Sequence, residues 1–437
     1  MRLAMKLPAG TKFSINGYVF SQLSSSAPSR SVSERERTVL GLLAGGDAAQ
    51  MLSVALAHRG IVRSWNVHTV HHRPGAGISV GYSVVLDHET GNGARTRYHT
   101  YVVATSARIN EERLLACEGR TVSWRDVRIH VWEHPHDPQL PALEKACDQG
   151  LFEQWLGEET DIELLTYRPT RRAVVKILPL DSEATFFGKV MEPGQVPGVV
   201  SRLRMLERSG VPAPRVSRVD DAGLVVTTAV SGMPLNKVYA SVHPNNIERM
   251  RGVLDSLADT LDSLPMVAIG LPARPAWADR CEHYAHAAGV ALPEQAARSR
   301  AVAQRIRQRL ANADMGPLVP THGDFYEANI FIDQASGRVS GVLDVDNLGP
   351  GYRVHDWACL LGHMSVLPGL APKTYPHVDQ LLTDWTARVA RWVDPQALGA
   401  CAAGVVLSLV AGARRSKKKN WQVEALSRLE VAEKWLG

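Results

Sequence analysis

The stretch between residues 318 and 348 constrains the fold of this chain more than any other. Its pattern predicts a strand, a tight polar loop and a strand-turn-strand hairpin, inside a half of the chain whose patterns are otherwise helical. Asp324 and Asn329 share the loop, and the hairpin returns Asp344 to the same end. Three oxygen-bearing side chains are therefore expected to meet at one point, which suits a hard cation such as Mg²⁺ that keeps several waters.

These residue types are the ones that phosphoryl transfer needs. A carboxylate must orient the accepting hydroxyl and take its proton, while an amide oxygen and a second carboxylate hold Mg²⁺ across the nucleotide phosphates. An isolated His-Gly-Asp tripeptide would be weak support, because Gly-Asp turns are common. The ordered combination with an Asn five residues on, an apolar strand, a turn at Gly337 and a Leu-Asp pair favours catalysis over a chance structural hairpin.

The same motif carries a family resemblance. Its members are, in chain order, His322, Gly323, Asp324, Asn329, Leu343 and Asp344. Together they resemble the catalytic and metal loops of the aminoglycoside phosphotransferase and choline kinase superfamily, which has the protein-kinase fold. The resemblance implies that Asp324 is the catalytic base and that Asn329 and Asp344 are magnesium ligands. It also implies that His322 braces the loop by hydrogen bonds and that Asp356 is a buried structural carboxylate.

Two further acids in this stretch have open alternatives. Glu327 lies between the predicted base and the metal-binding Asn, where a substrate could reach it, and the alternative is a solvated loop acid. Asp346 either assists the metal, touches the substrate, or is a solvated residue just past the end of a strand. Both are kept as possible substrate or supporting residues.

Nucleotide binding requires a lysine on a strand of the small lobe. Lys189 lies two residues after Phe187 in a strand predicted over 184–190. Because side chains alternate along a strand, both residues are on one face, which is predicted to be inward. An ammonium group in such a place needs an anionic partner. A lysine that solubilises an edge strand is the alternative. By resemblance Lys189 contacts the phosphates, and backbone groups near Thr228 and Val230 pair with adenine. No clear acidic partner for Lys189 stands out, and Glu207 is the nearest candidate.

The order of the patterns predicts an α+β, two-lobed, protein-kinase-like fold. We expect an N-terminal α+β cap over 1–150 with a poorly structured lead-in at 1–32, a small nucleotide-binding lobe over 151–240, and a helical catalytic lobe over 241–437. Strand patterns after Arg-Pro pairs near residues 73 and 168 suggest a weak internal repeat, so that the cap echoes the small lobe. Helices are predicted at 34–59, broken at Gly45-Gly46, and at 141–156, 199–208, 246–264, 397–413 and 421–436.

Composition excludes several classes of function. With 49 Lys and Arg against 44 Asp and Glu in 437 residues, the charge of +5 does not indicate a nucleic-acid-binding protein. The five cysteines are far apart, which predicts neither a disulfide framework nor a zinc knuckle and fits a reducing cytosol. Clustered histidines near residues 68–72 and 130–136 are read as strand-edge and loop residues.

No secretion signal is apparent, and 397–413 is read as a buried helix, so we expect a cytoplasmic protein without a membrane span.

The predicted function is an ATP-dependent phosphotransferase that uses ATP and Mg²⁺ to phosphorylate a hydroxyl of a small molecule, aminoglycoside-like or another amino sugar. Two rivals remain: a kinase of a different metabolite, such as a sugar or an amino alcohol, and a catalytically silent kinase fold used for binding. Neither the acceptor nor the oligomeric state follows from the sequence, because substrate selection in such folds lies in loops without a transferable code.

Overall fold

The computed structural model describes residues 30–73, 76–89, 95–124, 127–415 and 420–437. The predicted lead-in at 1–32 therefore lies almost wholly outside the described residues. The chain forms two compact units: one comprises the described residues up to Pro197 together with Ser217–Thr228, and the other comprises Gly198–Val216 and Ala229–Gly437. The domain boundaries predicted at residues 150 and 240 stay predictions.

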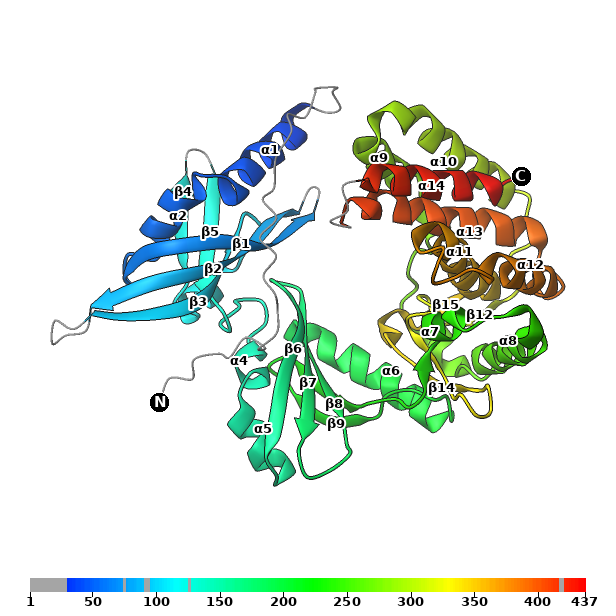
Figure 1. Cartoon of the computed structure of the whole chain (residues 1–437), viewed down its shortest axis with the longest axis horizontal. Helices are drawn as coiled ribbons and strands as arrows, with labels where there is room; N and C mark the ends of the chain where they lie inside the picture. The colour runs from blue at the N-terminus through cyan, green and yellow to red at the C-terminus, as the bar shows by residue number, and fades with distance from the viewer. Residues whose placement is uncertain (1–29, 74–75, 90–94, 125–126, 416–419) are drawn as a thin grey trace. The chain divides into compact units, whose positions relative to one another are not determined.

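The first unit begins with a helix pair on a five-stranded antiparallel sheet (Figure 1). The helices are α1 (Arg30–Ala44) and α2 (Ala48–Ala55), and the predicted break at Gly45-Gly46 is confirmed by a 74° bend between them. The sheet has the order β1-β2-β3-β5-β4, with strands β1 (Ile61–Arg73), β2 (Gly77–Glu89), β3 (Arg95–Thr105), β4 (Arg120–Trp124) and β5 (Val127–Glu133). Apolar residues of α1 and α2, such as Leu43 and Met51, pack on one sheet face with Tyr82 and Val84.

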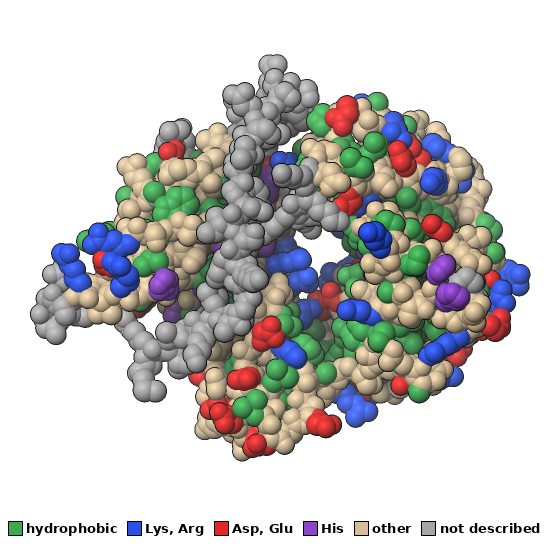
Figure 2. All heavy atoms as spheres, viewed as in Figure 1, with side chains coloured by type: hydrophobic (Ala, Val, Ile, Leu, Met, Phe, Trp, Pro, Cys, Tyr) green, Lys and Arg blue, Asp and Glu red, His purple; other side chains and the backbone are tan. Residues whose placement is uncertain are grey.

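Figure 2 shows Lys and Arg side chains gathered on the part of the molecule that holds this sheet. Arg63 and Arg97 both bind the carboxylate of Asp87, with shortest distances of 2.6 and 2.8 Å. These two hydrogen-bonded guanidiniums hold the pKa of Asp87 at about 2. Arg63 and Arg97 are therefore both paired with one acid, Asp87.

A second five-stranded antiparallel sheet follows in the same unit, with the order β6-β7-β8-β10-β9. Its strands are β6 (Thr160–Arg168), β7 (Arg172–Pro179), β8 (Phe186–Met191), β9 (Val216–Asp220) and β10 (Leu224–Thr228). The helix predicted over 141–156 is two helices, α4 (Leu143–Ala146) and α5 (Gln149–Leu156). The chain breaks between them because the carboxylate of Asp148 caps α5, accepting from the N–H groups of Gly150 and Leu151.

The strand order is the same in both sheets, which confirms the predicted internal repeat at the level of topology. A helix stands at the same place in each, between the third and fourth strands: α3 (Glu111–Ala116) and α6 (Val196–Arg208). The two sheets are joined by buried polar contacts. Tyr167 accepts from the indole N–H of Trp132 at 3.3 Å and donates to Asp137, which is 1% exposed, at 2.7 Å.

The second unit is mainly helical and carries two small sheets, β11-β13-β14 and β12-β15. Beyond most of α6, its helices are α7 (Leu235–Ala240), α8 (Ile247–Asp262), α9 (Cys281–Ala291), α10 (Ala296–Leu310), α11 (Arg353–Leu370), α12 (Val378–Val389), α13 (Pro395–Val410) and α14 (Trp421–Lys434). Its short strands are β11 (Met233–Pro234), β12 (Leu318–Thr321), β13 (Ile330–Ile332), β14 (Val339–Val342) and β15 (Gly349–Tyr352). Sheets early and helices late confirm the predicted α+β class.

The most apolar helix lies in the interior, as predicted for 397–413. By length and composition the segment Pro395–Arg414 could cross a membrane, but 72% of its apolar window is buried inside the fold, among α9, α10, α11 and α14. In the last helix, α14, two apolar residues differ in exposure. Leu429 is fully buried, whereas Val423 is 65% exposed.

Candidate active site

The loop between β12 and β13 brings the predicted catalytic residues together. Asp324 lies in this loop and Asn329 immediately precedes β13. The antiparallel pairing of β13 with β14 continues one step beyond the strands, since the N–H of Leu343 donates to the backbone oxygen of Asn329 at 2.8 Å. Asp344 is the next residue, so the hairpin returns it to the mouth of the loop.

The side chain of Asn329 is fixed by Asp324. Its amide nitrogen donates to the backbone oxygen of Asp324 at 3.0 Å and lies 3.5 Å from the Asp324 carboxylate. Because the nitrogen is used in this way, the amide oxygen is the group left to accept a cation. The carboxylate of Asp344, at a left-handed backbone position (φ 55°), supplies a second hard oxygen. This donor set fits Mg²⁺, which binds few protein oxygens and retains waters.

His322 is locked within the loop. Its ring nitrogen Nε2 lies 3.0 Å from the backbone oxygen of Leu343 and therefore donates, while Nδ1 accepts from the N–H of Asp324 at 3.3 Å. This pairing requires the neutral ring. Burial lowers the pKa of His322, which is 1% exposed, in keeping with that tautomer. The imidazole thus ties the loop of Asp324 to the strand end that leads to Asp344.

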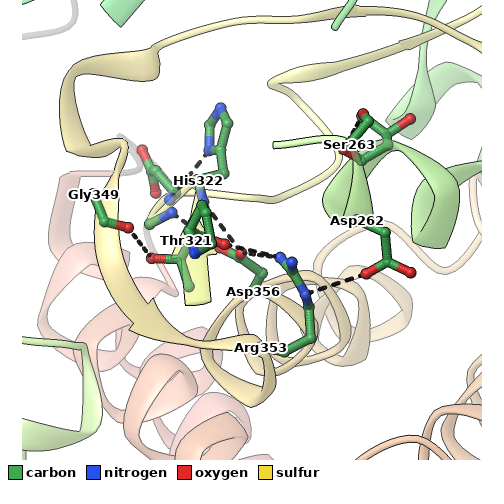
Figure 3. A network of polar contacts seen from close by, with 11 residues as sticks. Asp262, Ser263, Thr321, His322, Gly349, Arg353 and Asp356 are labelled. Atoms are coloured by element: carbon green, nitrogen blue, oxygen red, sulfur yellow. Dashed lines mark hydrogen bonds and ion pairs between the residues drawn. The ribbon is translucent and has the colours of Figure 1, made fainter. Parts of the chain in front are cut away.

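A buried carboxylate holds the start of the same loop. Asp356, on α11, accepts from the N–H of His322 at 3.1 Å and from that of Gly323 at 2.9 Å. Figure 3 shows this network continuing through Arg353, which lies 3.5 Å from Asp356 and 3.7 Å from the exposed Asp262 on α8. The prediction of a buried, hydrogen-bonded Asp356 is confirmed. Its burial raises its pKa, an effect that His322 and Arg353 oppose.

Gly323 is required by the geometry of this loop. Its φ of 78° is a left-handed conformation, and a Cβ placed there would lie 2.9 Å from both Cβ and the backbone oxygen of Asn347. Asn347 belongs to the short turn that follows Asp344. A side chain at Gly323 would therefore separate the loop of the base from the segment that carries the predicted metal ligand.

Glu327 is not a solvated loop acid, so that alternative is wrong. Its side chain is 6% exposed, and its Oε2 atom is buried without a hydrogen-bond partner among the described residues. Burial, with a smaller effect from Asp324, raises its pKa to about 7. Asn236 and Tyr239, on α7, also each have a buried side-chain oxygen without a hydrogen-bond partner in the described part of the chain. The N–H of Asn236 donates to the backbone oxygen of Glu327 at 3.3 Å. Asp346, in contrast, is half-buried.

Of the predicted nucleotide-binding residues, Lys189 and Thr228 lie on strands of the second sheet, whereas Val230 belongs to the second unit. Lys189 is half-buried on β8, the central strand, so an edge-strand role is wrong. Lys189 and Phe187 point to the same face of the sheet, as predicted. This face is opposite the one on which α4 and α5 pack, so Lys189 does not point into that hydrophobic core. Thr228 ends β10. Val230 packs on the β14 strand, where a Cβ on Gly341 would come within 2.5 Å of it.

The candidate partner of Lys189 has another neighbour. Glu207 lies 3.8 Å from Arg215 and its side chain is 49% exposed, which fits a surface acid. The charged side chain that is buried on α6 is that of Arg202, which is 8% exposed. Sequence reasoning missed Arg202, although it occurs on the apolar stripe of this helix with Val199 and Leu206. A charged residue among the apolar positions of a helix indicates, from the sequence alone, that its side chain is buried.

A comparison with protein families matches one of them. The phosphotransferase enzyme family (APH) matches residues 164–393, which is just over half of the chain and includes the predicted catalytic, metal-binding and nucleotide-binding residues. This match agrees with the resemblance seen in the motif and with its protein-kinase-like fold. Among curated proteins, none matches.

Solved structures that are similar to this chain include several aminoglycoside phosphotransferases. A thermostable mutant of APH(4)-Ia, in ternary complex with ADP and hygromycin B, is 13% identical, with a TM-score of 0.47, over 66% of this chain and 98% of that chain. APH(3'')-Id from Streptomyces rimosus is 20% identical, with a TM-score of 0.40, over 59% and 96%. A putative aminoglycoside phosphotransferase from Ralstonia eutropha is 14% identical, with a TM-score of 0.44, over 66% and 98%.

Proposed function

Because this chain belongs to the phosphotransferase enzyme family, we propose that it transfers the γ-phosphate of ATP to a hydroxyl group of a small molecule. The observation that carries the proposal is the hydrogen bond from Asn329 to Asp324, which holds the amide next to the proposed base and leaves the amide oxygen to accept a cation. A silent binding fold has no need of this arrangement. The other rival, a kinase of a different metabolite, uses the same chemistry.

Asp324 is the base in this proposal. It is half-buried at the head of the loop, and its own backbone is held on both sides, by His322 at its N–H and by Asn329 at its oxygen. A carboxylate positioned in this way orients the accepting hydroxyl and takes its proton as the bond to phosphorus forms. The neutral His322 does not exchange that proton, since both of its nitrogens are occupied within the loop.

Asn329 and Asp344 would hold Mg²⁺ through one oxygen each. When bound, the ion would neutralise charge on the nucleotide phosphates. Lys189 would contact these phosphates, and the backbone near Thr228 and Val230 would pair with the adenine. The same proposal assigns Asp346 and Glu327 to the surroundings of the substrate.

For the acceptor we propose an aminoglycoside-like molecule or another amino sugar, with a sugar or amino alcohol as the second candidate. The buried Glu327 beside the base supports an amino group on the acceptor. We place the enzyme in the cytoplasm, with neither nucleic acid nor membrane as a partner. The five cysteines are free, and three of them are buried, which supports a reducing compartment.

An acceptor screen tests the proposal. Purified protein with ATP and Mg²⁺ is tested against panels of aminoglycosides, sugars and amino alcohols, and ADP release is measured. Asp324→Ala is expected to lower acceptor-dependent turnover by on the order of 10²–10⁴-fold. Asp221→Ala, in an exposed turn, is the control and should retain activity. Unchanged turnover in Asp324→Ala would discard the base, and ADP release with sugars alone would discard the aminoglycoside acceptor.

A further inference from the structure

Two arginines bind the turn that follows the predicted metal ligand. This turn is the 3₁₀ segment Val345–Asn347 with Leu348. Arg202, on α6, donates from Nε to the backbone oxygen of Leu348 at 2.9 Å and from Nη1 to Gly198 at 3.0 Å. Arg274, in the loop before α9, donates from Nη1 to the side-chain oxygen of Asn347 at 2.9 Å.

Among the described residues, no carboxylate is hydrogen-bonded to either of these two arginines. The bonds above all end on neutral oxygens. Other arginines of the same unit behave differently: Arg251 and Arg298, for example, bind the carboxylates of Asp384 and Glu433 at 2.8 and 2.6 Å. Holding the buried guanidinium of Arg202 without an anion is costly, whereas the exposed Arg274 is solvated.

The electrostatics of Arg202 agree with this description. Burial lowers its pKa, the charge of Arg274 lowers it further, and Asp346 is the acid that opposes them. The two guanidiniums therefore repel one another. Each also has N–H donors beyond those used in the bonds given above. An oxyanion between them would relieve the repulsion and accept these donors.

The turn lies beside the centre where transfer is proposed. It starts at the residue after Asp344, and Asn347 packs so closely on Gly323 that no Cβ fits there. Gly323 in turn precedes Asp324. Arg274 is thus connected, through the side chain of Asn347, to the backbone of the loop that carries the base.

We propose that Arg202 and Arg274 form an oxyanion subsite on this turn, which takes a phosphate or carboxylate group next to the transfer centre. Its place in catalysis rests on the proposed function, whereas its ability to bind an oxyanion does not. Two sources supply this chemistry: the phosphoryl group being transferred, or an acidic group on the acceptor. Guanidinium groups suit both, because their planar donors match two oxygens at once.

Binding of inorganic phosphate to the nucleotide-free, full-length protein tests the subsite without any assay of activity. Calorimetric titration compares the natural protein with Arg274→Gln and Arg202→Gln, and with Arg280→Gln as the matched control. Arg280 is an exposed arginine from the same segment, whose guanidinium lies over the rings of Trp277 and Tyr284 instead of on the turn. We expect phosphate affinity to fall by about 10-fold or more in both subsite variants and to stay unchanged in the control.

Equal phosphate affinity in the natural protein and Arg274→Gln would overturn the proposal. Because Arg202→Gln removes the hydrogen bond to Leu348, the melting temperature of this variant is measured first to check that it folds. Arg274 is exposed, so its variant is expected to fold and decides the question alone. This result is independent of the acceptor screen: a protein without phosphotransferase activity that still binds phosphate through Arg274 would sink the proposed function and keep the subsite.

Kinetics then distinguish the two sources. Paired acceptors that differ in one acidic group, such as glucose with glucuronate and glycerol with glycerate, are compared by their kcat/KM. If the subsite takes the acceptor's acid, the acidic member is preferred and Arg274→Gln removes the preference by raising KM. If it takes the phosphoryl group, Arg274→Gln lowers kcat with every acceptor and leaves the preference unchanged. A variant whose kinetics match those of Arg280→Gln in both comparisons would contradict the subsite's role in transfer.

Discussion

The side-chain amide of Asn329 donates to the backbone oxygen of Asp324 at 3.0 Å, so the residue proposed to bind metal also orients the residue proposed as base. Replacing Asn329 with Ala removes both the donor and the metal-facing oxygen. We expect the Mg²⁺ concentration that gives half-maximal ADP release to rise by about 10-fold or more. Asn312→Ala, an exposed asparagine after α10, is the control. An unchanged Mg²⁺ requirement in Asn329→Ala would remove this residue from the metal site.

A pair of glycine variants separates backbone strain from the contact at the active loop. Gly323→Ala and Gly316→Ala both place Cβ at a left-handed position, with φ of 78° and 74°, but only the first meets other atoms, because nothing lies within 4 Å of the second. Each should lower the free energy of unfolding by about 1–3 kcal/mol. Gly323→Ala alone should also reduce kcat. Equal activity in the two variants would show that the contact with Asn347 is dispensable.

Glu327 predicts a particular dependence of stability on pH. Its pKa is about 7 in the folded chain against an ordinary value of 4.5, so the folded state binds more protons between these values. Its contribution is complete below pH 4.5 and is lost as pH rises toward and through 7, a loss on the order of 3 kcal/mol at most. Glu327→Gln cannot ionise and should lack this loss.

Urea unfolding of the natural protein and Glu327→Gln at pH 5 and pH 8 measures the effect. The variant should gain stability relative to the natural protein at the higher pH. Glu294→Gln, an exposed glutamate, should follow the natural protein. If Glu327→Gln also follows it, the carboxyl of Glu327 is not the group that titrates.

Lys189 is predicted to act on the nucleotide. Lys189→Met keeps most of the side chain's apolar length on the central strand β8 and removes only the ammonium. We expect the KM for ATP to rise by about 10- to 100-fold while the melting temperature changes little. Lys434→Met, on an exposed part of α14, serves as the control. An unaltered KM for ATP would leave Lys189 without a role in phosphate binding.

Much of the fold follows from local pattern. The helix at 397–413 was predictable because an apolar stretch without charges needs a buried environment, and the bend after Ala44 was predictable because two consecutive glycines interrupt a helix. The split at Asp148 was missed, since the helical periodicity continues through it. Only the capping bonds of its carboxylate reveal that a new helix begins there.

The sequence by itself determined the grouping of Asp324, Asn329 and Asp344. These residues lie within one loop and one hairpin, so short-range geometry suffices to bring them together. Tertiary structure alone decided the burial of Glu327, the support of the loop by Asp356 and the binding of Arg202 and Arg274 to one turn, because each depends on segments that are distant in the chain. The physical reason is that desolvation and charge pairing depend on what surrounds a side chain in space, whereas hydrogen-bonded turns depend on what precedes and follows it.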